Sequence, residues 1–193
     1  MQAEPKWYLG SRDDYYAPSR NRSAYPIRQG DIFVLPEMPP TWSALQVVHP
    51  TCELSKPAVR EIQVVKVEPF SGLSDDHQRS LVAAGLSEKS GAWRIAMAHT
   101  FFLRPWGRVR DPHYANFREI ALISRDNLRA EHRVAALTHD CRVTFIRRWL
   151  YFRFRILLSF DEVRNLEAAR ISMDPTFEGP RPPWAPLRTR SGD

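Results

Sequence analysis

Four prolines limit the fold of this chain more than any other feature, because they divide the stretch from Gln29 to Leu54 into short extended pieces. Residues 32–35 are typical of a short strand that follows a turn. Residues 36–43 hold three of the prolines, which cannot donate to a β-ladder, so this segment is a loop. Residues 44–49 then read as a buried strand that Pro50 ends. We interpret the stretch as the nucleus of the fold.

The remaining strands are predicted from apolar runs that turn residues or prolines interrupt. They cover residues 60–68, 93–103, 118–123 and 132–137. A single helix is expected among them at residues 75–84, because Ser74 suits an N-cap and two aspartates favour the first turn.

A pair of helices is predicted after the strands. Thr138 is suited to cap the first, whose apolar residues recur at steps of three and four and indicate a buried helix. Those residues are Cys141, Phe145, Trp149, Phe152 and Ile156. Ser159 and Glu162 form a capping box for a second helix, which is expected to end near Arg170.

The length of 193 residues fits one domain. We expect an α+β protein: a small, strongly bent, mostly antiparallel SH3-like barrel with a C-terminal helical pair. The expected divisions are an irregular N-terminal arm (1–28), a barrel-like core (29–137) with the inserted helix 75–84, the helical pair (138–172) and a proline-rich tail (173–193). Aromatics of the arm either stack on bases or pin the arm to the barrel.

The formal net charge is +6, and all but four of the 28 basic residues are arginines. Arginine contacts phosphates and carboxylates in a bidentate manner, so nucleic acid is a candidate partner. A GC-rich genome produces the same arginine bias without any functional cause. No apolar run is long enough to cross a bilayer, and the N-terminus has no secretory signal. We therefore expect a cytoplasmic protein without membrane contact.

The turn after the second strand brings reactive side chains together in sequence: His49, Thr51, Cys52 and Glu53. A cysteine nucleophile needs a nearby base, and His49 precedes Cys52 by three residues. The turn is therefore the candidate catalytic site. A packing role for both cysteines is the competing interpretation.

His49, Cys52, His139 and Cys141 have the ligand types of a structural zinc site. His139 and Cys141 point to opposite faces if their segment is helical, so the pattern does not decide whether the four bind zinc. No phosphate-binding loop or other cofactor motif is present, and no cofactor is expected.

A loop rich in arginine is the candidate nucleic-acid contact. It carries Arg104, Trp106, Arg108, Arg110 and His113. Arginines can hold phosphates while an aromatic ring stacks on a base. The alternative is a solvated loop in which an arginine pairs with Asp111 or Glu119.

The order of these pieces carries a resemblance. Gly30-Asp31-Ile32 opens a strand, residues 45–49 lead into the polar turn, residues 62–67 end at a proline, and residues 120–128 form a strand and turn before the helix. Over residues 29–137 this resembles the MazF/PemK toxin family. The chain is also similar to uncharacterised bacterial proteins that pair a QGD strand with a T-C-D/E-L turn, a similarity that names no function.

The resemblance to MazF/PemK implies an SH3-like barrel that cuts RNA. It maps the family's catalytic Ser or Thr onto Thr51, with His49 or Glu53 as base. The family's arginine near the first loop has no counterpart, because residues 36–43 contain no basic residue.

Three functions follow from the sequence. The first is a binding module that contacts RNA or DNA through the arginine-rich loop. The second is a MazF-like endonuclease with its site at the polar turn. The third is a protein-interaction subunit of a larger assembly, with a protein partner or a second copy of the chain. The sequence does not decide whether the protein is an enzyme.

Overall fold

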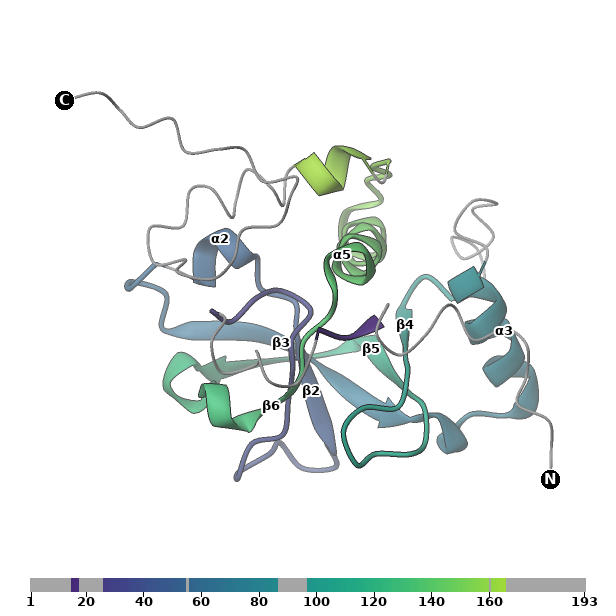
Figure 1. Cartoon of the computed structure of the whole chain (residues 1–193), viewed down its shortest axis with the longest axis horizontal. Coiled ribbons are helices and arrows are strands. Elements are labelled where there is room, and N and C mark those ends of the chain that lie inside the picture. The colour runs from purple at the N-terminus through teal and green to yellow at the C-terminus, as the bar shows by residue number, and fades with distance from the viewer. Residues whose placement is uncertain (1–14, 18–25, 55, 87–96, 160, 166–193) are drawn as a thin grey trace.

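The computed structural model describes residues 15–17, 26–54, 56–86, 97–159 and 161–165. Its α+β fold consists of one antiparallel sheet of six strands with helices around it (Figure 1). The elements in chain order are β1 (Ile32–Phe33), β2 (Ala44–Val47), α2 (Thr51–Leu54), β3 (Glu61–Pro69), the 3-10 helix η2 (Phe70–Gly72), α3 (Asp75–Leu86), β4 (Thr100–Leu103), β5 (His113–Ser124), the 3-10 turns η3 (Arg125–Asn127) and η4 (Ala130–His132), β6 (Arg133–Ala135) and α5 (His139–Phe154).

The sheet has the strand order β4-β5-β3-β2-β1-β6. Consecutive strands β1, β2 and β3 form a meander, as the proline loop and the polar turn predict. Gly30 begins it with a φ of +93°, and a Cβ there would lie 2.9 Å from Leu137 Cδ1. Only glycine combines that backbone angle with so close a neighbour.

Both faces of the sheet are covered. On one face, α5 packs Phe145, Ile146 and Trp149 onto strands β1 to β6. The opposite face of β1, β2 and β3 forms a second core under the loops, with Leu54 and Leu128 closing it. Because both sides are covered, all four residues of β2 are buried, including the polar Gln46, whose Nε2 donates to the Gly30 carbonyl.

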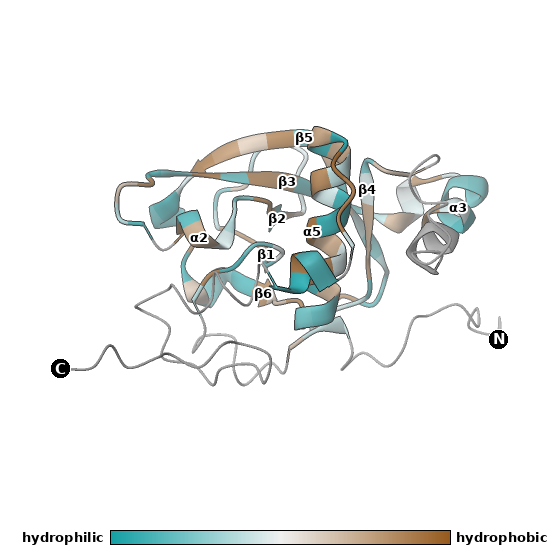
Figure 2. Ribbon diagram, turned by 90° about the horizontal axis from the view of Figure 1, so that it is seen from above, coloured by the Kyte–Doolittle hydropathy of each residue, from teal (hydrophilic) through white to brown (hydrophobic). Residues whose placement is uncertain are grey.

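The predicted barrel is wrong in one respect, since the sheet does not close. Its edge strands are β4 and β6, and no strand pairing joins them among the described residues. These strands have four and three residues, too short to curl round to each other. Instead, α5 lies across the opening between them (Figures 1 and 2).

Two tyrosines of the N-terminal arm also bridge the opening. Tyr16 forms a β-bridge with Leu137 just after β6, while the hydroxyls of Tyr15 and Tyr16 donate to the carbonyls of Phe102 and Arg104 at β4. Both rings are buried. This part of the arm is therefore pinned to the core, as one of the two interpretations of its aromatics predicts.

The predicted helices within the described residues are present. Thr138 Oγ1 accepts the Cys141 N–H at the start of α5, and Ser159 and Glu162 form the expected reciprocal capping box. The helix expected at 75–84 is α3. The end of the second C-terminal helix and the tail 173–193 lie outside the described residues. Among those that are described, no helix is both long enough and apolar enough to span a membrane.

Candidate functional site

A tight turn shapes the arginine-rich loop between β4 and β5. The Val109 N–H donates to the Trp106 carbonyl at 2.8 Å, and Gly107 adopts a φ of +54°. The turn projects Arg108 into solvent, while the Trp106 side chain folds inward with 3% of its surface exposed. Thus one short turn separates the cation from the aromatic ring.

Beneath this loop lies a pocket of about 390 Å³. The loop and the first residue of β5 form one wall, and residues beside β1, β2 and β6 form the other. The lining consists of Val34, Ser43, Ala44, Trp106, Gly107, Arg108, Val109, His113, Arg133 and Val134. The volume falls in the range of small-molecule sites, and a mostly apolar wall with few polar groups is usual for them.

Trp106 and His113 form the aromatic part of the wall. Their ring centroids are 4.7 Å apart at an interplanar angle of 55°. The His113 ring is held by its Nδ1 at 3.0 Å from the Asp111 carbonyl, and burial lowers the pKa of His113 below its usual value. The imidazole is therefore neutral near pH 7.

The sequence predicted five contact residues in this loop, and the structure gives them different environments. Arg108 and Arg110 are exposed. Arg104, Trp106 and His113 are buried, so Trp106 is not an open stacking platform on the surface. The solvated-loop alternative expects an ion pair between Arg108 or Arg110 and Asp111 or Glu119. Within the described residues, no such ion pair is formed.

Arg133 also lines the pocket, but its charge is neutralised by an ion pair with Asp31. Its Nη1 lies 2.8 Å from Asp31 Oδ2, and both side chains are 1% exposed. The same nitrogen donates to the Pro26 carbonyl. Removal of one partner of a buried ion pair leaves an uncompensated charge, which is strongly unfavourable. The pair therefore holds the Arg133 side chain in place. The cation available to a ligand is therefore Arg108.

The polar turn after β2 forms the four-residue helix α2, and its four candidate catalytic side chains have different environments. The Thr51 hydroxyl is buried and accepts the Gln29 N–H at 3.1 Å. Glu53 forms an exposed ion pair with Lys56 at 2.6 Å. His49 Nδ1 accepts the Gln63 N–H at 3.4 Å, and burial lowers its pKa. Cys52 is a partly buried thiol.

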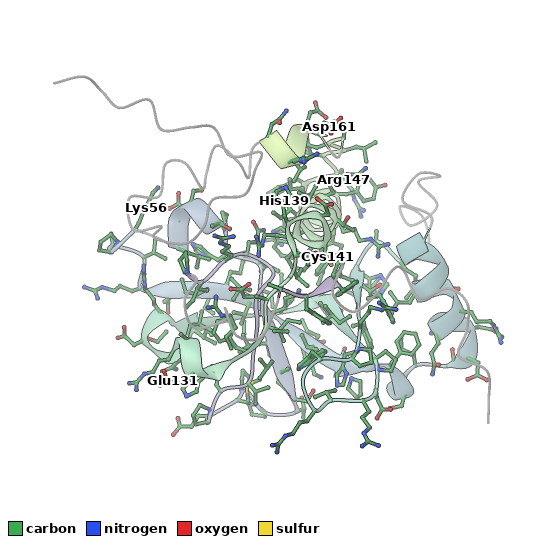
Figure 3. All side chains as sticks on the ribbon, viewed as in Figure 1. Lys56, Glu131, His139, Cys141, Arg147 and Asp161 are labelled. Atoms are coloured by element: carbon green, nitrogen blue, oxygen red, sulfur yellow. The ribbon has the colours of Figure 1, made fainter. Side chains whose placement is uncertain are left out.

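The four residues of the zinc hypothesis are not assembled. Within the described part of the chain, no three histidine, cysteine or acidic side chains come close enough to hold a metal ion. His139 and Cys141 lie on different sides of the first turn of α5 (Figure 3). This follows from their spacing of two residues on a helix.

A second basic cluster, which the sequence reasoning missed, surrounds the start of α5. Arg142 is buried and donates to the carbonyls of Gln29 and Leu137 at 3.0 and 2.8 Å. Burial, followed by the charges of Arg142, Arg164 and Arg28, lowers the pKa of His139 to about 4. Only Arg142 has a sequence signal, because it follows His139 by three residues on one helix face.

No protein-family model matches this sequence, and no curated protein matches it at a significant level.

Proposed function

We propose that the protein binds single-stranded nucleic acid and holds one nucleotide in the pocket beneath the arginine-rich loop. The observation that carries this proposal is the composition of the pocket wall: two adjacent aromatic rings, Trp106 and His113, beside the exposed guanidinium of Arg108. Both rings are buried, so they give the pocket an aromatic, apolar wall against which a base can lie, while arginine contacts phosphate.

The charge of the molecule supports the same partner. The formal net charge is +6. Arg108 lines the pocket and Arg110 follows it in the same loop; both are exposed, and neither has a carboxylate partner among the described residues. Such cations attract a polyanion and gain free energy from counterion release. A single strand suits the pocket because its bases are free to leave the stack and enter it.

The experiment is fluorescence anisotropy with labelled single-stranded RNA, single-stranded DNA and duplex DNA over a range of salt concentrations. We expect the single strands to bind with an affinity that falls steeply as salt rises. In the variant Arg108→Gln/Arg110→Gln, affinity should fall. For the single strands, the slope of log Kd against log salt should decrease by about 1.4, roughly 0.7 for each phosphate that the variant no longer neutralises.

The matched control is Arg79→Gln/Arg129→Gln, which removes the same charge from two exposed arginines outside the loop. It should keep nearly all of the affinity and the salt slope. Equal losses in both double variants would show that only net charge attracts the nucleic acid. Absent or salt-independent binding of every probe would overturn the proposal.

A further inference from the structure

Within the described residues, strand β5 has a free edge over half of its length. It pairs with β3 from His113 to Ser124, but on its other side β4 pairs only with residues 113–116. The Phe117 N–H still donates to the His99 carbonyl, and from Arg118 onward no described strand lies beside it. Figure 2 shows β5 as the outer rim of the sheet.

The hydrogen-bond pattern identifies which backbone groups face outward along this edge. The Arg125 N–H donates to the Arg60 carbonyl, while the Gln63 carbonyl accepts from Val48 on the β2 side. Alternate residues of a strand bond to opposite sides. Given the register Ile62↔Ile123, the N–H and C=O groups of Ile120, Leu122 and Ser124 therefore point away from β3.

Leu122 lies at the centre of this edge and is its most exposed apolar residue. Its side chain is 60% exposed, the largest value among the exposed large hydrophobic residues that the structure describes. An edge with outward backbone groups and an exposed leucine is a template for addition of another strand. Neither lysine nor proline, the usual protections of a strand edge, occurs between residues 118 and 124.

A second copy of β5 fits this edge in one antiparallel register. With a two-fold axis at Leu122, the two Leu122 residues face each other and Ile120 faces the partner's Ser124, so every outward group is paired. An axis at Ile120 would bring the partner's Ser124 opposite Asn116, where β4 already pairs. An axis at Ser124 would leave Ile120 opposite residues beyond the end of the strand.

Charges at both ends of the free edge match in this register. In this register Glu119 approaches the partner's Arg125, and Arg118 approaches the partner's Asp126, both in the 3-10 turn η3 that follows β5. These residues lie outside the strand pair itself, but opposite charges near its two ends favour this partner. The two-fold symmetry repeats both pairs, so the edge is complementary to itself in backbone, apolar and charged groups.

We infer that the chain forms a symmetric homodimer by antiparallel pairing of the β5 edges across Leu122. Each facing pair of Ile120 and Ser124, and the central pair of Leu122 residues, exchanges two N–H···O bonds. The interface is smaller than that of an obligate dimer, so association depends on protein concentration.

The test is sedimentation equilibrium of the full chain over a wide concentration range. We expect the mean mass to rise toward twice that of one chain. Leu122→Lys places two like charges at the axis and removes the apolar contact, so dimerisation should weaken roughly tenfold or more. Leu157→Lys is the control, because Leu157 is an exposed leucine outside this edge. It should dimerise as the parent does.

Cross-linking tests the register. In a Cys52→Ser background, Leu122→Cys should form a disulfide dimer under mild oxidation, because facing Cα atoms lie about 5.5 Å apart. Leu157→Cys, at an exposed leucine outside the edge, should not. A monomer at every concentration would overturn the inference, as would equal cross-linking of both variants. A dimer that Leu122→Lys leaves intact would also overturn it.

Discussion

At the scale of single residues, whether a side chain can contact a ligand depends more on its burial than on its position in the sequence. Trp106 and Arg108 stand two residues apart in a loop, yet one is enclosed and the other is in solvent. Likewise Thr51 resembles a catalytic residue in sequence, but its hydroxyl accepts the Gln29 N–H inside the fold. Sequence shows which groups are present, and only packing decides which of them can meet a ligand.

His139 gives the clearest pH dependence. Its folded pKa of about 4 lies below the ordinary 6.5, chiefly because of burial and then because of the arginines around it. In the unfolded chain the ring gains its proton near pH 6.5, while in the folded chain it stays neutral. Acid therefore favours unfolding: stability present above pH 6.5 is lost as the pH falls toward 4.

We predict that His139→Gln flattens the fall in the free energy of unfolding between pH 6.5 and 4. The difference should reach about 2 kcal/mol, after allowance for the partial exposure of the ring. Urea denaturation at a series of pH values measures it. Identical slopes for His139→Gln and the parent would refute the assignment.

At the scale of secondary-structure elements, two residues of the N-terminal arm link the edge strands β4 and β6, which do not pair with each other within the described residues. Tyr15 and Tyr16 connect the end of β6 to β4 through one backbone bridge and two hydroxyl bonds to carbonyls. Hydrogen bonds to buried carbonyls contribute modestly, but an acceptor left without its donor costs more. Tyr15 and Tyr16 should therefore contribute to stability.

We predict that Tyr15→Phe/Tyr16→Phe lowers the free energy of unfolding by about 1–3 kcal/mol, since both rings remain and only the hydroxyl bonds are removed. Amide hydrogen exchange should become faster at Ala17 and Thr138, whose N–H groups donate to Ala136 and Tyr15. Exchange within β3, far from these bonds in the strand order, should change only with global stability. Unaltered stability and exchange would show that the hydroxyl bonds are dispensable.

Elements with local sequence signals were predictable. The period of the apolar residues, together with the Thr138 cap, placed α5 correctly, and the prolines placed β1 and β2. The strand expected at 93–103 is confirmed only as β4, since residues 87–96 lie outside the described part. The polar turn became a short helix, because four residues provide too little pattern to distinguish the two.

At the scale of the whole molecule, the contacts between distant segments were not predictable. Whether β4 meets β6 depends on the twist and length of strands about 30 residues apart, and no local pattern encodes it. The pocket has the same origin, since its walls come from four separate segments around Val34, Ser43, Trp106 and Arg133. The proposed nucleic-acid function is therefore a prediction from pocket chemistry.

Phe145 of α5 holds the two ends of the open sheet together. Its ring lies 5.1 Å from that of Phe101 on β4 and 5.7 Å from that of Phe117 on β5. At the other end of the sheet, a Cβ on Gly30 would lie 3.5 Å from Phe145 Cδ1, so the ring also packs where β1 begins. One fully buried side chain thus contacts both halves of a sheet that lacks closure by hydrogen bonds.

We therefore predict that Phe145→Ala lowers the free energy of unfolding by about 3–5 kcal/mol, which is the cost of a large cavity in a core. Phe154→Ala removes the same ring from the end of the same helix, where it is 59% exposed, and should change stability by less than about 0.5 kcal/mol. Thermal and urea unfolding measure both. If the packing of α5 does not stabilise the open sheet, the two variants will unfold alike. If the packing of α5 takes the place of barrel closure, only Phe145→Ala will be strongly destabilised.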